Sequence, residues 1–168
     1  MESLRRALRK QVLRYCTSLA MVAPTMGSRI RFNRWKGVRI GRDPWLGALV
    51  YLDIHHSHPD RAQSLVLGDG VAIGNNVSIY THDSLYNRVT EGREPVRFGR
   101  VVIGDWCNIS PNSFLYNCTI GHHSIVAPGA VVVNAEFPPY SLIAGNPARV
   151  VRSVRERVEG SRAAALEG

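Results

Sequence analysis

The side chains that could carry chemistry in this sequence are its histidines and a few nearby carboxylates. His82 and Asp83 stand where a regular aliphatic pattern stops and a long polar segment begins. Histidine is the usual general base near neutral pH, because its ordinary pKa lies close to that range. A lone histidine at such a corner is more often structural, so His82 needs support from its surroundings. His55, His56 and His58 are expected to line or cover a cleft rather than to catalyse.

The three cysteines offer a second kind of reactive group. Cys16, Cys107 and Cys118 form no CxxC pair and have no metal-ligand spacing. This usage is typical of a reducing compartment with free and mostly buried thiols. The positions of Cys107 and Cys118 within the repeat described next predict structural thiols rather than nucleophiles.

A six-residue repeat from Leu65 to Ala148 must position these groups. An aliphatic residue, often followed by glycine, opens each hexad, as at Leu67, Ile73, Ile79, Ile103, Ile109, Leu115, Ile120, Val126 and Val132. A short repeat of this kind indicates a parallel β-helix. Three strands make one turn, so each inward aliphatic residue should stack on the one 18 positions away, and stacked turns bury a shared core that no single turn could bury. A sandwich or barrel with scattered Ile-Gly pairs fits less well, because the hexad openings keep the six-residue spacing over three uninterrupted runs.

Positive charge gathers at the beginning of the chain. Residues 1–42 hold eleven of the 21 Lys and Arg and only one acid, Glu2. Glu2 to Ala20 has the spacing of an amphipathic helix, and Arg29 to Gly37 is expected to lead into or cap the first turn. A solvated helix face explains the charge most simply. Contact with an anionic ligand or a membrane surface is a second reading. Nucleic acid is not expected, because no nucleic-acid motif accompanies the basic run.

The pattern divides the chain into three parts. Residues 1–36 form a basic helix and lead-in, residues 37–149 form the repeat domain, and residues 150–168 form a basic tail. Residues 54–64 and 82–100 interrupt the repeat as two loops, and insertions one turn apart suggest the walls of a site. Pro138-Pro139 is expected to close the last strand. The tail should be helical over Val150 to Val158 and unstructured after Gly160. We expect no signal peptide and no membrane-spanning helix.

Three segments resemble the hexapeptide-repeat O-acetyltransferases, most closely the sugar and polysaccharide branch. They are Ile73-Gly-Asn-Asn-Val-Ser-Ile-Tyr-Thr-His-Asp83, Ile103-Gly-Asp-Trp-Cys-Asn-Ile109 and Ala144-Gly-Asn-Pro-Ala-Arg-Val150. The resemblance implies an all-β, left-handed parallel β-helix with an N-terminal helix and a short C-terminal helix. It also implies a homotrimer with active sites between subunits, acetyl-CoA as the acyl donor, and a hydroxyl of a sugar or glycan precursor as the acceptor. The implied location is cytoplasmic, with the basic N-terminal helix a candidate for peripheral contact with the inner membrane face.

The same resemblance assigns roles to particular residues. His82 would be the general base, with Asp53 and Asp83 as candidates for contact with the acceptor, and Asp83 could instead orient His82. Ala127, Pro128, Asn134, Ala135, Arg149 and Arg152 occupy positions that meet coenzyme A in the family. Two departures stand out. Pro128 cannot donate the backbone hydrogen bond of the residue it replaces, and a Thr-Lys pair of the family is absent at residues 134–135.

Two other readings use the same fold. A γ-carbonic-anhydrase-like zinc enzyme would need three histidines, and His82, His122 and His123 supply that number. The histidine spacing of that family is missing, and adjacent histidines on a strand point to opposite faces, so only one could reach a shared metal. A non-catalytic scaffold would keep the coil but bind no coenzyme A.

Overall fold

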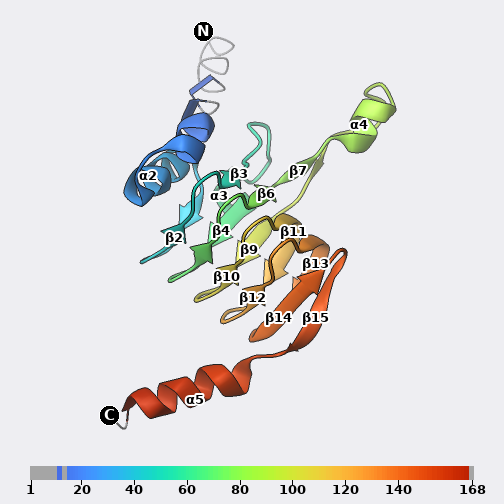
Figure 1. Cartoon of the computed structure of the whole chain (residues 1–168). Coiled ribbons are helices and arrows are strands. Elements are labelled where there is room, and N and C mark those ends of the chain that lie inside the picture. Colours follow the sequence, from blue (N-terminus) through green and yellow to red (C-terminus); the bar gives the residue numbers. More distant parts are fainter. Residues whose placement is uncertain (1–10, 13–14, 167–168) are drawn as a thin grey trace.

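The computed structural model describes residues 11–12 and 15–166. Short parallel strands coil around a common core, with helices at both ends and an arm that projects from one side (Figure 1). The predicted all-β class is therefore wrong, because helices precede, interrupt and follow the strands. The expected Glu2–Ala20 helix lies largely outside the described residues, and residues 15–22 are helical.

The strands form three runs, and each turn of the coil contributes one strand to each run. The first run contains β1 (Arg39–Ile40), β4 (Leu65–Leu67), β9 (Val101–Ile103) and the later halves of β11 (Phe114–Ile120) and β13 (Val131–Phe137). The second contains β2 (Trp45–Leu46), β5 (Ala72–Ile73), β10 (Asn108–Ile109), β12 (Ile125–Val126) and β14 (Ser141–Gly145). The third contains β3 (Tyr51–Leu52), β6 (Ser78–Tyr80) and the earlier halves of β11 and β13.

The core is the set of aliphatic residues that open the hexads. They pair across neighbouring turns, as Leu52 does with Ile79 and Ile109 does with Val126. The predicted inward residues from Leu67 to Val132 are all at most 2% exposed. Burying a side chain of this size contributes about 1.5–3 kcal/mol. The repeat therefore predicted the core correctly.

The predicted 18-residue turn is one residue too long. Ile103 pairs with Ile120, and Ile120 pairs with Phe137, so each uninterrupted turn takes 17 residues. The missing residue is at the corner between the third run and the first, which β11 and β13 cross without a break. Asn117 and Asn134 turn that corner with φ angles of 45° and 50°, a conformation that asparagine tolerates better than most residues.

Helix α2 (Met26–Lys36) covers the open end of the coil beside β2 (Figure 1). The helix begins at Thr25, whose side chain accepts a hydrogen bond from the Ser28 backbone N–H at 3.2 Å, and it ends at Gly37 with φ at 104°. Gly27 lies in the first turn of α2. The prediction of an end cap at Arg29 to Gly37 is confirmed, and the cap is helical.

The basic residues of α2 satisfy backbone carbonyls at the open edge of the first turn. Arg29 donates to the Leu46 carbonyl of β2, Arg34 to the Ile40 carbonyl of β1, and Lys36 to the Leu52 carbonyl of β3. Unpaired edge carbonyls would otherwise be open to another chain. Part of the N-terminal positive charge is therefore explained by capping of the coil.

The two insertions carry secondary structure of their own, which the prediction of simple loops missed. The first ends in the short helix α3 (Arg61–Ser64). The second is an arm made of β7 (His82–Asp83), α4 (Leu85–Val89) and β8 (Arg97–Phe98), with β7 and β8 paired antiparallel. Figure 1 shows that α4 lies at the tip of the arm, away from the coil.

The C-terminal part differs from its prediction in three ways. Pro138-Pro139 does not close the last strand, because β14 follows and pairs antiparallel with β15 (Ala148–Ser153). Residues 150–153 are therefore strand rather than helix, and α5 (Arg155–Leu166) makes residues 160–166 helical rather than unstructured. Among the described helices, none combines the length and apolar character that crossing a membrane requires.

Candidate active site

His82 lies at the base of the arm and is held by a carboxylate from another turn. Its Nδ1 is 2.6 Å from Oδ2 of Asp53, and the two side chains are only 22% and 14% exposed. With the proton on Nδ1 donated to the carboxylate, Nε2 is left as an acceptor. Within residues 11–12 and 15–166, Nε2 of His82 has no hydrogen-bond partner. The pair therefore offers one basic nitrogen to a bound molecule.

The stacking of β3 on β6 brings Asp53 and His82 together. Leu52 and Ile79 are register partners, and the Asp53 backbone N–H donates to the Ile79 carbonyl at 2.8 Å. The Thr81 hydroxyl then donates to the Asp53 carbonyl at 3.1 Å. Asp53 directly follows β3, and His82 begins β7 two residues after β6 ends, so the stacking of β3 on β6 brings the two side chains within reach of each other.

Asp83 does not contact the His82 ring. Its carboxylate accepts a hydrogen bond from the Leu85 backbone N–H at 2.8 Å, at the beginning of α4. Asp53, which was predicted to contact the acceptor, is thus the residue that orients His82 in this structure. A role of either carboxylate toward an acceptor stays a prediction.

Two aromatic rings lie beside His82. The His55 ring lies 4.6 Å from the His82 ring, and the Tyr80 ring lies 6.2 Å from it. His56 packs on His55 at 4.3 Å, and Phe98 from the returning arm packs on His55 at 5.5 Å. Both insertions therefore contribute to the surroundings of His82, as the sequence suggested.

His58 is placed differently from the other loop histidines. Its Nε2 lies 3.0 Å from the Gly99 carbonyl, and its ring packs against Phe98 at 5.2 Å. This contact joins the first insertion to the end of the arm, so His58 holds the two insertions together.

The residues predicted to bind coenzyme A lie in three places. Asn134 and Ala135 lie at the corner between the third run and the first. Asn117, at the same corner of the preceding turn, donates to the Asn134 side chain at 2.9 Å and accepts from the Arg100 backbone N–H at 3.2 Å. This corner therefore lies on the side of the coil where the arm ends. Ala127 and Pro128 follow β12 at another corner, where the Ala127 backbone N–H donates to the Ile143 carbonyl. Arg149 and Arg152 are exposed on β15. Strand β14 lies between Ala127 and Arg149, because Ala127 donates to Ile143 and Ala144 pairs with Arg149, whereas Asn134 and Ala135 lie at a different corner.

Two of the three thiols are buried in the coil and poorly suited to nucleophilic chemistry. Burial raises the pKa of Cys107 to about 11 and that of Cys118 to about 12. Thiolates are the reactive form, so both groups are largely inert near neutral pH. The prediction of structural thiols agrees with this placement.

Lys36 is a buried cation that the sequence did not single out. It is 4% exposed, and its amine donates to the Leu52 carbonyl next to Asp53. Burial lowers the pKa of Lys36 to about 8, while the Asp53 carboxylate acts in the opposite direction. Lys36 could have been predicted only by knowing which strand-end carbonyl the capping helix contacts.

The lowered pKa of Lys36 makes stability depend on pH. The unfolded chain holds the Lys36 proton up to about pH 10.5, but the folded chain releases it above about pH 8. Because the unfolded state binds more protons in that window, unfolding free energy should rise with pH there. Relative to Lys36→Met, the parent should gain roughly 2 kcal/mol between about pH 7.5 and about pH 10. Urea unfolding of both proteins at the two pH values measures this difference, and parallel pH dependences would contradict it.

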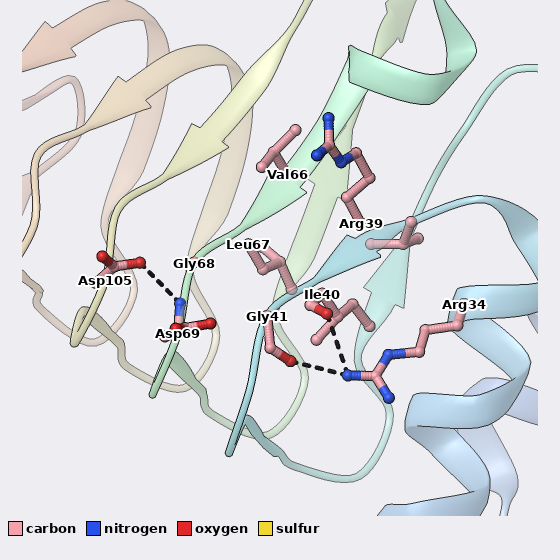
Figure 2. Close-up of a pocket in the computed structure, with 10 residues that line it drawn as sticks. Arg34, Arg39, Ile40, Gly41, Val66, Leu67, Gly68, Asp69 and Asp105 are labelled. Carbon is pink, nitrogen blue, oxygen red and sulfur yellow. Dashed lines mark hydrogen bonds between the residues drawn. The ribbon is translucent and has the colours of Figure 1, made fainter.

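A separate hollow lies beside β1 and β4, where α2 meets the coil. It has a volume of about 490 Å³, and its lining includes Arg34, Arg39, Asp69 and Asp105. Figure 2 shows Arg34 bonded to the Ile40 and Gly41 carbonyls, and Asp105 bonded to the Asp69 backbone at 2.8 Å. Several polar groups of the hollow are thus used in holding the chain, and none of its lining residues was predicted to bind substrate or cofactor.

Among known proteins, the chain is similar to acetyltransferases. Serine acetyltransferase 2 of Arabidopsis thaliana is 32% identical over 100 residues, which cover 58% of this chain and 29% of that protein. A serine acetyltransferase of Buchnera aphidicola is 29% identical over 99 residues, which cover 57% of this chain and 36% of that protein. The chain thus spans only about a third of the length of these relatives. No family model matches it.

Solved structures of similar shape cover most of the chain. The hexapeptide-repeat acetyltransferase of Vibrio cholerae is 26% identical with a TM-score of 0.62, and the match covers 88% of this chain and 91% of that one. A second structure of that protein holds acetyl coenzyme A. A galactoside acetyltransferase in complex with coenzyme A is 18% identical with a TM-score of 0.61, covering 94% and 84% of the two chains. In its repeat and its coiled parallel strands, the chain is thus similar to the hexapeptide-repeat acetyltransferases.

Proposed function

We propose that this protein transfers an acetyl group from acetyl-CoA to a hydroxyl of a sugar or glycan precursor, with His82 as the general base. The observation that carries the proposal is the Asp53–His82 pair, with Nδ1 of His82 held by the carboxylate at 2.6 Å. A carboxylate on Nδ1 fixes the ring orientation and the tautomer, and leaves Nε2 to accept a proton.

The reaction needs only proton movement at His82. Nε2 takes the proton of the acceptor hydroxyl as the hydroxyl oxygen attacks the thioester carbonyl. The C–S bond then breaks, and the imidazolium returns the proton to the departing thiolate. Asp53 stabilises the imidazolium while it exists, and a backbone N–H from a neighbouring turn would stabilise the oxyanion. No covalent acyl-enzyme is required, in keeping with the raised pKa values of Cys107 and Cys118.

The acceptor is proposed from what the similar proteins share. Serine and galactosides both offer a hydroxyl, so the names of the matched proteins support transfer to oxygen. The sugar is favoured over serine by the sequence segments that end at Asp83 and Val150. Aromatic rings near His82, including Tyr80 and Phe98, suit the apolar face of a sugar ring.

We also propose that the coil is left-handed and that the protein forms a homotrimer with the active site between subunits. Outward side chains of the third run are largely apolar or aromatic, with Tyr80 packed between Tyr51 (5.1 Å) and Phe114 (5.4 Å) and Val133 40% exposed. A contiguous apolar strip of this kind suits contact with another copy. That contact would set a second wall beside His82 and near Asn134.

The test is release of the coenzyme A thiol from acetyl-CoA in the presence of candidate acceptors. The panel should include free sugars, nucleotide sugars, glycan fragments and serine, with protein-free reactions as the baseline. We expect acceptor-dependent thiol release with at least one sugar or glycan and none with serine. Release with serine alone would overturn the sugar assignment, and no release with any acceptor would overturn the proposed activity.

A further inference from the structure

Three basic residues of α2 cap the open end of the coil, but they are not equivalent. Arg34 is exposed and Arg29 is half-buried, whereas Lys36 is 4% exposed. A neutral donor would be sufficient to satisfy one carbonyl. Removing an ammonium group from water is costly unless a charge nearby compensates. The buried charge at Lys36 therefore needs a reason that capping does not supply.

The surroundings of Lys36 lead directly to the candidate active site. Its amine donates to the carbonyl of Leu52, the residue that precedes Asp53, and lies 6.0 Å from the centre of the Tyr51 ring. The Tyr51 hydroxyl in turn lies 3.5 Å from Oδ1 of Asp53, while Oδ2 of Asp53 holds His82. The strongest charge interaction of Lys36 is with Asp53. A cation, a carboxylate and the imidazole therefore follow one another from the core toward the surface.

We propose that Lys36 is a positioning residue for the Asp53–His82 pair, because its buried ammonium group fixes the end of β3 and neutralises the charge of Asp53. This inference rests on the proposed acetyl transfer for its catalytic meaning, but its electrostatic part concerns the protein without substrate. The cation compensates the charge of the Asp53 carboxylate, whose Oδ2 pairs with Nδ1 of His82. Because one positive charge disfavours a second one nearby, we expect Lys36 to oppose protonation of the His82 ring.

Other ionisable groups around the pair are few and can be separated from Lys36. Those near His82 or Lys36 on the elements packed against them are Asp53, Tyr51, Tyr80, His55, His56, Cys16, Arg61, Asp83 and Arg97. Burial and Asp53 raise the pKa of Tyr51 to about 12, so Tyr51 stays neutral through the working range. Lys36, with its pKa near 8, carries its charge at neutral pH and loses it at moderately alkaline pH.

The test is the pH titration of the His82 ring, followed by nuclear magnetic resonance in the whole protein without substrate. His82→Asn identifies the signal. Lys36→Arg keeps the charge, Lys36→Gln keeps an amide donor for the Leu52 carbonyl but no charge, and Lys36→Met keeps neither. We expect the His82 midpoint to move to higher pH by about half a unit in the Gln and Met variants, and to stay in place in the Arg variant. A Gln variant whose His82 curve matches the parent would overturn the proposal and leave Lys36 a simple cap.

The parent protein alone supplies a second readout that no misfolded variant can obscure. If the Lys36 charge acts on the pair, the His82 signal should show a second, smaller inflection near pH 8. A His82 signal that is flat from its own midpoint to about pH 10 would overturn the proposal. Both measurements stand even if no acceptor is acetylated, so failure of this inference and failure of the proposed activity are distinguishable.

The effect of Lys36 on His82 should also appear in steady-state kinetics. The Gln variant should lose more of its kcat at about pH 6.5 than at about pH 9, with KM for acetyl-CoA unchanged, because fewer His82 rings are neutral at the lower pH. An equal loss at both pH values would indicate a structural role and overturn the proposal.

Discussion

Replacing His82 with asparagine should lower kcat for acetyl transfer by about 10²–10⁴-fold, the usual contribution of a general base. Asparagine can still pair with Asp53 but cannot take a proton from an acceptor hydroxyl. Affinity for coenzyme A should change little, because the ring would contact the acceptor rather than the cofactor. Steady-state kinetics and calorimetric binding of coenzyme A measure the two effects separately.

The matched control is His123→Asn, the same substitution outside the site. His123 contacts His122 at 2.9 Å and Arg162 of α5 at 2.9 Å, in the turn that follows β11. Its variant should turn over at nearly the parent rate. If His82→Asn also retained the parent rate, His82 would not be the base.

Asp53→Asn should lower kcat by about 10²-fold or more while leaving the fold in place. An amide at this position can present its N–H₂ to Nδ1, which favours the tautomer with the proton on Nε2 and removes the accepting lone pair. The substitution also removes the charge that compensates Lys36, so the pKa of Lys36 should fall below its present value of about 8. Kinetics of the variant test the first effect, and urea unfolding against pH tests the second.

The neighbouring carboxylate gives a control with the same chemical change. Asp83 accepts from the Leu85 backbone at the beginning of α4 and does not contact His82. Asp83→Asn should therefore keep most of the turnover. A loss as large as that of Asp53→Asn would give Asp83 a role in orienting His82 or in contacting the acceptor, and would contradict the account.

The core of the fold could be predicted from the sequence because the repeat marks the residues that point inward. Each aliphatic residue at the head of a hexad is buried, and the two interruptions of the pattern mark the insertions that reach His82. The 17-residue length of each turn was harder to predict. The corner at Asn117 and Asn134 loses one residue through positive φ angles, which the hexad count alone does not require.

The candidate site could be predicted only in part. His82 was singled out by the segment that resembles the acetyltransferases and by its place at the beginning of an insertion, and its role stays a prediction. Its partner was assigned to the acceptor instead, because Asp53 is distant in sequence and becomes a neighbour only when β3 is aligned with β6. Matching Leu52 with Ile79 as successive inward residues would have placed Asp53 beside the segment Tyr80 to His82.

The helical parts were the least predictable. Arg29, Arg34 and Lys36 looked like a basic patch, because the sequence does not show which carbonyls are left open at the edge of the first turn. The arm was expected as a loop, since β7 and β8 are two residues long and depend on each other for pairing. Contacts between distant segments decide both features.

The central claim is that Nε2 of His82, held in place by Asp53, meets the acceptor hydroxyl beside the thioester of acetyl-CoA. A crystal structure of the protein with coenzyme A and the acceptor found in the thiol-release panel tests it most directly. The account predicts the acceptor hydroxyl within about 2.6–3.2 Å of Nε2, with the coenzyme A sulfur on the other side of that oxygen. An acceptor and sulfur bound together at any place out of reach of His82 would contradict it.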